Sequence, residues 1–216
     1  LVFRVGPEWR FVRLAQPGEV WALRARGRFI GLTDEHLVVE DGGIYSWSLR
    51  HHAVAPEAWL DVPFVGPLVQ GYATGMYADG RIMAAPVDDL DRRVVVMHPR
   101  HARGLVADRY GRLVTATVID GGGAIIAAKI DGTNADRPIV LGRPRPPADC
   151  ALERITATAR GDIAMHYVRL NMGSVPPCGV DVLAADGSGF MPAAPVHSAT
   201  ITPSDPDATE SRTVVP

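Results

Sequence analysis

Residues 72–85 read Tyr-Ala-Thr-Gly-Met-Tyr-Ala-Asp-Gly-Arg-Ile-Met-Ala-Ala, two apolar runs separated by Asp79-Gly80-Arg81. Glycine reaches positive φ at no steric cost, and Asp-Gly between apolar runs is a strong local signal for a β-hairpin. Tyrosine, threonine and isoleucine on either side suit a pleated surface. The stretch therefore predicts two antiparallel strands joined by a tight turn at Gly80.

The same arrangement recurs along the chain: an apolar strand, a glycine next to Arg or Asp, and further strands. Four copies cover residues 20–49, 72–97, 104–128 and 155–184, with hinge glycines Gly27, Gly80, Gly111 and Gly161. These glycines are 53, 31 and 50 residues apart. One such sheet cannot bury its apolar face alone, so successive copies must pack on one another. We expect an all-β protein of three- to four-stranded antiparallel meanders, β-propeller-like, with a β-sandwich stack as the alternative.

Proline-rich and polar segments divide the chain. We expect the first three meanders within residues 1–142, a fourth β unit in residues 143–197 after the proline-rich linker at 142–147, and an extended polar arm over residues 198–216. Helical periodicity is limited to one or two turns around Pro56–Leu60.

The composition excludes several classes of function. The chain has 216 residues, 47% of them hydrophobic, and its 22 basic and 24 acidic side chains leave a net charge of −2. A surface this close to neutral gives no general attraction for nucleic acid. The longest apolar runs are far shorter than the roughly 20 residues of a membrane helix, and the first residues lack the pattern of a signal peptide. We therefore expect no nucleic-acid partner and no membrane span.

The two cysteines, Cys150 and Cys178, lie 28 positions apart and match no zinc-binding spacing. They can form one disulfide, or remain two buried thiols in a reducing compartment. The spacing does not choose between these alternatives.

One loop invites comparison with serine proteases of the chymotrypsin type. Asp186-Gly187-Ser188-Gly189 follows His52 and Asp89 in the His, Asp, Ser order of that family. The family's loop reads Gly-Asp-Ser-Gly, however, and the surroundings of His52 do not match. We interpret the loop as a turn, and we expect no catalytic residues and no enzyme.

Metal ligands are the second kind of site to consider. The sequence His98-Pro99-Arg100-His101 places two imidazoles three apart, beside a pair at 51–52 and the carboxylates of Asp88, Asp89 and Asp91. Residues three apart on a strand point to opposite faces, and Pro99 excludes a regular helix. Residues 131–136 carry several oxygen ligands but lack the glycine and distal glutamate of an EF-hand loop, so a hairpin turn is the preferred interpretation. We expect solvent-facing histidines, no metal and no cofactor.

Aromatic residues suggest a binding surface. All four tryptophans lie in the first sixty positions. Trp21 and Trp47 occupy expected strands and suit a core, whereas Trp9 and Trp59 lie in expected loops. Exposed tryptophans stack on sugars in carbohydrate-binding modules, so Trp9 and Trp59 are the candidate ligand-binding residues.

A polar arm without a core of its own is typically ordered by a neighbouring chain. We therefore expect the arm to bind a partner through Thr200, Ile201, Pro203, Val214 and Val215.

Lys129 is the only lysine among the basic residues, a bias typical of GC-rich genomes, and Leu1 is what a TTG start codon read literally would give. In this composition, and in propeller-like repeats over residues 20–187, the sequence resembles minor tail and other virion proteins of phages that infect actinobacteria. The resemblance implies an oligomeric virion component that contacts other tail proteins or the host surface, where a glycan is a further candidate partner. The alternatives are a free-standing carbohydrate- or protein-binding module, extracellular or cytoplasmic in a GC-rich bacterium, and, third, a serine hydrolase.

Overall fold

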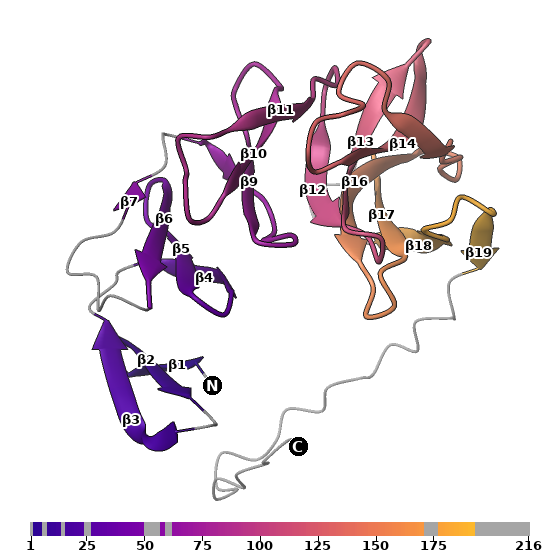
Figure 1. Ribbon diagram of the computed structural model, residues 1–216. Coiled ribbons are helices and arrows are strands. Elements are labelled where there is room, and N and C mark those ends of the chain that lie inside the picture. Colours follow the sequence, from indigo (N-terminus) through magenta and orange to yellow (C-terminus); the bar gives the residue numbers. More distant parts are fainter. Residues whose placement is uncertain are drawn as a thin grey trace, which may run out of the picture.

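The computed structural model describes residues 2–5, 8–13, 16–23, 27–49, 57–58, 62–170 and 177–192. These residues form five antiparallel sheets that follow one another along an arc (Figure 1). The described part contains no helix, and so none that could cross a membrane. The predicted all-β fold is confirmed.

The first sheet has three strands and each later sheet has four, and within every sheet the spatial order follows the chain. The first two sheets contain β1 (Val2–Val5), β2 (Glu8–Arg13) and β3 (Gln16–Leu23), then β4 (Arg28–Leu32), β5 (His36–Glu40), β6 (Ile44–Ser48) and β7 (Glu57–Ala58). The third contains β8 (Phe64–Val65), β9 (Tyr72–Met76), β10 (Ile82–Pro86) and β11 (Val94–Met97). The last two contain β12 (Arg103–Ala107), β13 (Arg112–Ile119), β14 (Gly122–Lys129) and β15 (Ile139–Gly142), then β16 (Cys150–Ala157), β17 (Ile163–Arg169), β18 (Pro177–Leu183) and β19 (Phe190–Pro192).

The glycine hinges are where the sequence predicts them. Strands β9 and β10 pair from Met76 opposite Ile82, and the Gly80 amide donates to the Tyr77 carbonyl at 3.0 Å in the turn between them. The φ angles of Gly27, Gly80, Gly111 and Gly161 are 105°, 89°, 69° and 74°. Because L side chains rarely adopt such angles, glycine is required at these turns.

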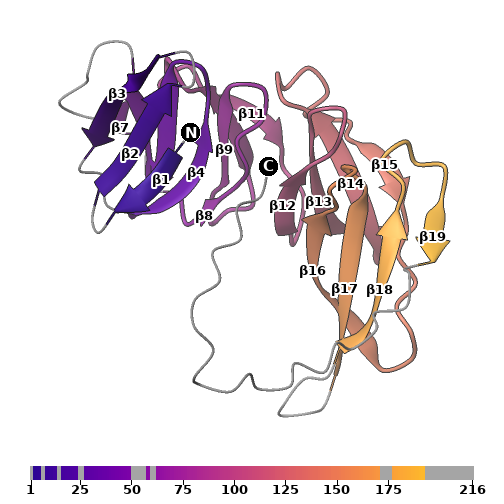
Figure 2. The same cartoon turned by 90° about the horizontal axis from the view of Figure 1, so that it is seen from below.

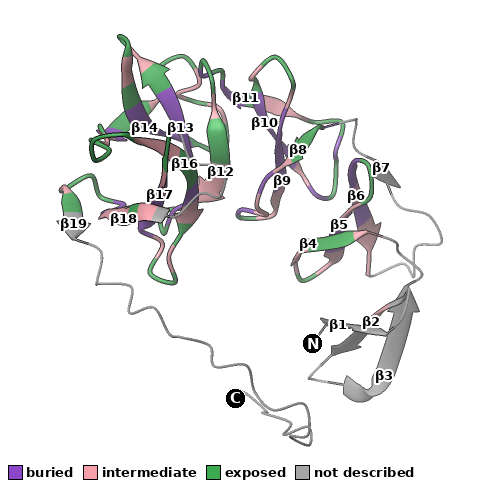
Figure 3. Cartoon of the chain, turned by 180° about the vertical axis from the view of Figure 1, so that it is seen from behind, coloured by how far each residue is buried: buried purple, intermediate pink, exposed green. Residues whose placement is uncertain are grey.

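Each inner sheet buries both of its faces. On β13, Leu113 packs in a cluster with Ile82 and Val96 of the third sheet. Its neighbour Val114 packs on the opposite face with Met165 of the fifth sheet. This alternation is the two-residue period of a strand, and it explains why the strands read as nearly continuous apolar runs. Buried residues accordingly run along both faces of β10, β13 and β14 (Figure 3).

The first strands of successive sheets, and the residues shortly after them, approach closely at glycines. A β-carbon built on Gly31 would lie 2.5 Å from Leu68, one on Gly66 would lie 2.6 Å from Leu105, and one on Gly104 would lie 3.0 Å from Ile155. In each pair the second residue lies on the first strand of the next sheet or shortly after it, so the same kind of contact repeats three times. This repeated contact between successive sheets is what propeller blades require, and it favours the propeller-like arrangement over a sandwich stack (Figure 2).

Two details differ from the sequence-based expectations. Val20–Leu23, assigned to the first meander, belongs to β3 of a separate sheet that precedes it. Glu57 and Ala58, where a helical turn was the candidate, form the short strand β7 because they pair with Ser46 and Tyr45.

Candidate functional site

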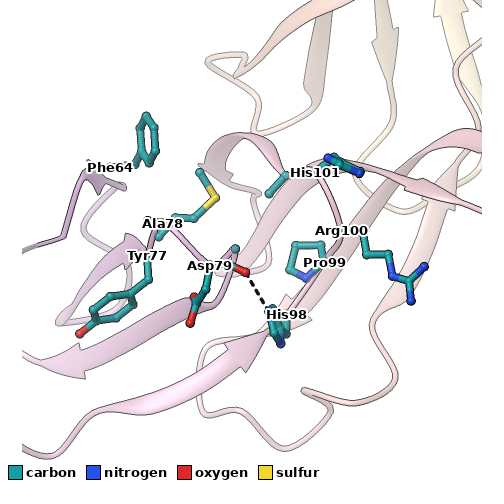
Figure 4. Close-up of a pocket in the computed structure, with 11 residues that line it drawn as sticks. Phe64, Tyr77, Ala78, Asp79, His98, Pro99, Arg100 and His101 are labelled. Carbon is teal, nitrogen blue, oxygen red and sulfur yellow. Dashed lines mark hydrogen bonds between the residues drawn. The ribbon is translucent and has the colours of Figure 1, made fainter.

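The segment that joins β11 to β12, residues 98–102, borders a cavity at one end of the third sheet. Strands β9 and β11 run in the same direction, so the β9–β10 turn and this segment lie at the same end of the third sheet. Together with the exposed end of β8 they enclose about 660 Å³. We call this cavity the connector groove; it is lined by Phe64, Met76, Tyr77, Ala78, Asp79, Gly80, His98, Pro99, Arg100, His101 and Ala102 (Figure 4).

The floor of the connector groove is held by the β9–β10 turn. The carboxylate of Asp79 accepts the Arg81 backbone N–H at 3.0 Å and pairs with its guanidinium at 2.6 Å. These contacts, the backbone bond first, lower the pKa of Asp79 below its ordinary value. The His98 ring nitrogen Nε2 lies 3.0 Å from the Asp79 backbone oxygen, so the imidazole donates to it. His98 is thereby fixed against the turn.

Further hydrogen bonds hold the rest of the segment in place. The Thr117 hydroxyl on β13 donates to the Arg100 carbonyl, and the Arg103 guanidinium donates to the Leu152 carbonyl on β16 at 2.7 Å. Together with His98, these contacts fix the segment to the third, fourth and fifth sheets. His101 has a φ of 54°, an uncommon conformation for a side chain other than glycine. Strain of this kind persists only where the surroundings determine the backbone.

The exposed side chains of the groove can contact a partner. Phe64 is 59% exposed and stands at one end of the cavity, with Arg100 at the other (Figure 4). Within the described part of the chain no carboxylate pairs with Arg100, whereas Arg81 is paired and lies 5.4 Å from the centre of the Tyr77 ring. The groove thus offers an apolar ring and an uncompensated positive charge on a fixed backbone.

Trp9, a candidate ligand-binding residue, lies on strand β2 rather than in a loop. Its ring is 5.5 Å from that of Phe29 and packs at the edge of a cluster around Leu37 and Val39. A sugar-binding role for Trp9 stays a prediction. The other candidates lie outside the described residues: Trp59, Thr200, Ile201, Pro203, Val214 and Val215.

The protease-like residues occupy separate places. Ser188 lies in the turn between β18 and β19, where its backbone N–H donates to the Asp186 carboxylate at 2.8 Å. Asp89 lies in the β10–β11 turn of the third sheet and forms no hydrogen bond with Ser188. His52 is outside the described residues. The turn interpretation of 186–189 is confirmed.

The histidine and aspartate candidates for metal binding also separate. His98 and His101 line one cavity, although the three-residue spacing suggested opposite faces, because the segment that carries them is a loop and not a strand. Among the described residues no group of three or more His, Cys, Asp or Glu side chains is placed to hold a metal ion. Asp131 accepts the backbone and hydroxyl donors of Thr133, and residues 131–136 form part of the turn between β14 and β15, as predicted.

A disulfide joins Cys150 on β16 to Cys178 on β18, with the two Cα atoms 6.3 Å apart. This selects the first of the two alternatives that the sequence left open. Cys150 also lines a second cavity that adjoins the connector groove.

The fold and the site define a β-propeller-like protein with a groove at one end of the third sheet, beside the segment that leads to the fourth. No family model and no curated protein matches the sequence. Among solved structures, the N-terminal domain of Nup159 superposes with a TM-score of 0.52 at 9% identity, covering 85% of this chain and 55% of that one. A quinonprotein alcohol dehydrogenase-like protein from Bacteroides thetaiotaomicron VPI-5482 superposes with a TM-score of 0.42 at 12% identity, covering 86% and 63%. The chain therefore spans slightly more than half the length of these structures, and the Nup159 match shows the propeller-like fold alone.

Proposed function

We propose that the protein is a non-enzymatic protein-binding scaffold and one component of a larger assembly, with the connector groove as its binding site. The observation that carries this proposal is that Phe64, at the end of β8, and Arg100, in the fixed segment 98–102, lie on either side of one cavity, with no carboxylate of the described residues paired to Arg100. Aromatic and arginine side chains contribute most to the binding energy of protein interfaces. A partner that meets a fixed backbone also loses less entropy on the scaffold side when it binds.

The chemistry of the groove supports binding over catalysis. Its lining has no serine, threonine or cysteine that could act as a nucleophile, and the one carboxylate, Asp79, is occupied by Arg81. His98 donates one ring N–H to a backbone carbonyl, and the lining offers its other ring nitrogen no serine, threonine or cysteine to activate. The virion and phage-tail setting expected from the sequence resemblance stays a prediction and is the finer form of this proposal.

A displayed random peptide library tests the proposal. The protein is immobilised, and bound peptides are compared between the parent, Phe64→Ala and Arg100→Ala. The matched controls are Phe190→Ala, an exposed phenylalanine on β19, and Arg160→Ala, an exposed arginine in the β16–β17 turn. We expect selected peptides to bind the parent and both controls, and to bind the two groove variants at least about tenfold more weakly, the change that 1.4 kcal/mol produces.

A glycan array on the same immobilised protein distinguishes the main alternative. Glycan binding that depends on Trp9, without any peptide binding that depends on Phe64 or Arg100, would replace the scaffold by a carbohydrate-binding module. Selected peptides that bind the groove variants as tightly as the parent would show that the connector groove is not the site.

A further inference from the structure

A second cavity of about 380 Å³ adjoins the connector groove, and His101 lines both. It lies between the fourth and fifth sheets, beside the segment that links β15 to β16. Its wall is mainly aliphatic, and its apolar lining residues are Ala116, Val118, Pro144, Pro146, Ala151 and Leu152. Val118 is 44% exposed, which leaves this wall accessible from the surface.

The charges around the two cavities are predominantly positive. Their combined lining includes two arginines, Arg100 and Arg103. The one carboxylate in that lining, Asp79, pairs with Arg81 at 2.6 Å. The joined groove therefore carries positive charge in a protein whose net charge is −2. A local field opposite in sign to that of the whole molecule favours a complementary, acidic ligand.

We propose that the two cavities form one continuous groove for an acidic peptide segment of a partner protein. Carboxylates of the segment pair with Arg100 and Arg103, and a neighbouring aliphatic or proline side chain enters the cavity beside Val118. This rests on the proposed function and names its partner by chemistry. Nucleic acid fits less well because the phenyl and phenol rings of the groove, Phe64 and Tyr77, line only its first cavity, and the wall of the second cavity is mainly aliphatic.

The backbone between the two cavities is held in advance of binding. Arg103 donates one N–H group to the Leu152 carbonyl, and its guanidinium carries further donors. Gly104, the second residue of β12, has a φ of 70° and packs against Ile155, within the register shift between Arg103 and Val106. A peptide therefore meets cationic groups whose supporting backbone is tied to three sheets.

Three matched peptide libraries on a cell surface test this chemistry. Each library has twelve random positions, half of them drawn from Leu, Val and Pro; the other half are Asp and Glu in the first library, Lys and Arg in the second, and Ser and Asn in the third. A labelled oligo(dT) of 20 nucleotides is the fourth probe. We expect the parent protein to enrich the acidic library alone and to leave the oligonucleotide unbound.

Two variants then locate the binding of individual acidic peptides by fluorescence anisotropy. Arg100→Glu reverses the charge of an exposed side chain and keeps the hydrogen bond from the Thr117 hydroxyl to the backbone carbonyl of residue 100. Val118→Asp places a carboxylate in the apolar cavity. We expect each to weaken binding about tenfold or more, and a rise in salt from 50 to 300 mM to weaken parent binding severalfold. Arg160→Glu is the control with no loss, and the melting temperatures of all variants confirm that they fold.

The outcomes separate this inference from the proposed function. If the basic or neutral library is enriched and binding of its peptides still depends on Phe64 or Arg100, the groove binds proteins, but the prediction of an acidic partner is wrong. If no library is enriched, or if the oligonucleotide binds instead, both the proposed function and the acidic-peptide inference are wrong. If acidic peptides bind Arg100→Glu as tightly as the parent, the groove is not where they bind.

Discussion

Gly161 lies directly against the backbone of Arg109. A β-carbon at Gly161 would sit 2.6 Å from the Arg109 nitrogen, and that nitrogen donates to the Gly161 carbonyl at 3.3 Å. The two residues belong to equivalent turns, after β12 and after β16, so this contact joins the fourth sheet to the fifth. It leaves no space for a side chain, because the atoms in the way are backbone and cannot rotate aside.

Gly161→Ala should therefore lower the free energy of unfolding by more than the unfavourable φ of the new alanine would alone. A left-handed φ costs a non-glycine residue about 1–2 kcal/mol, and overpacking against a fixed backbone adds about 1–3 kcal/mol. Gly121→Ala is the matched control, because Gly121 has a φ of 75° and nothing within 4 Å of the added carbon. Urea unfolding measures both. Equal losses in the two variants would show that the contact with Arg109 is not close.

The disulfide should contribute substantially to stability. Closing a loop with a sequence separation of 28 between Cys150 and Cys178 stabilises a fold by about 3–4 kcal/mol in the chain-entropy view. We expect Cys150→Ser/Cys178→Ser, and reduction of the parent, to lower the unfolding midpoint by similar amounts. A thiol titration of the purified, unfolded protein provides the check: the chain has two cysteines, so two reactive thiols without reductant would contradict the bond.

Much of the fold could be predicted from local signals. Positive φ is a property of single residues, so Gly27, Gly80, Gly111 and Gly161 marked their turns without any knowledge of packing. A further local signal was missed. Asp108 and Thr158 lie three residues before Gly111 and Gly161, and each side-chain oxygen accepts two backbone N–H groups of its turn. This polar residue would have identified the third and fourth repeats as the same kind of turn, because it lies at the same offset from the glycine in both.

The connector groove could not be predicted because its parts are brought together by packing between sheets. Phe64 and Arg100 carry no motif, and Arg103 meets the Leu152 carbonyl across 49 positions of sequence. The histidines at 98 and 101 did draw attention, but the strand geometry assumed for them gave the wrong relative direction. Likewise, the disulfide depends on how β16 and β18 flank β17, which a 28-residue spacing does not specify.

Among the carboxylates of the described ion pairs, Asp108 should be the one whose removal lowers the free energy of unfolding most. Its side chain is fully buried, and it receives the Arg112 guanidinium at 2.6 Å while that same guanidinium donates to the Ala185 carbonyl of the fifth sheet. Removing one member of a buried pair leaves the other uncompensated and costs about 3–5 kcal/mol. We expect Asp108→Ala to lose about 3 kcal/mol in chemical unfolding, since Arg112 is 18% exposed and keeps some contact with water.

Glu40→Ala is the control for this prediction. Glu40 and Arg28 also lie 2.6 Å apart, but their side chains are 31% and 68% exposed, so their pair should contribute less than about 1 kcal/mol. Because the two ion pairs have the same distance, the difference between the two losses of unfolding free energy measures the effect of burial. A loss at Asp108 no greater than that at Glu40 would mean that the contact between the fourth and fifth sheets does not depend on the Asp108–Arg112 pair.

His166 should make the protein less stable in mild acid. It lies on β17 with Nε2 2.8 Å from the Thr156 hydroxyl, and burial, followed by the charge of Arg154, lowers its pKa, while Glu153 opposes the shift. The unfolded chain then binds the proton more tightly than the folded one, so the contribution of neutral His166 is present above its ordinary pKa of about 6.5 and is lost as the pH falls below it. Melting temperatures of the parent and of His166→Gln should therefore diverge from pH 7 to pH 5, with the variant losing less. His36→Gln is the control, a half-buried histidine at the start of β5. Parallel curves for the parent and His166→Gln over this range would contradict the assignment.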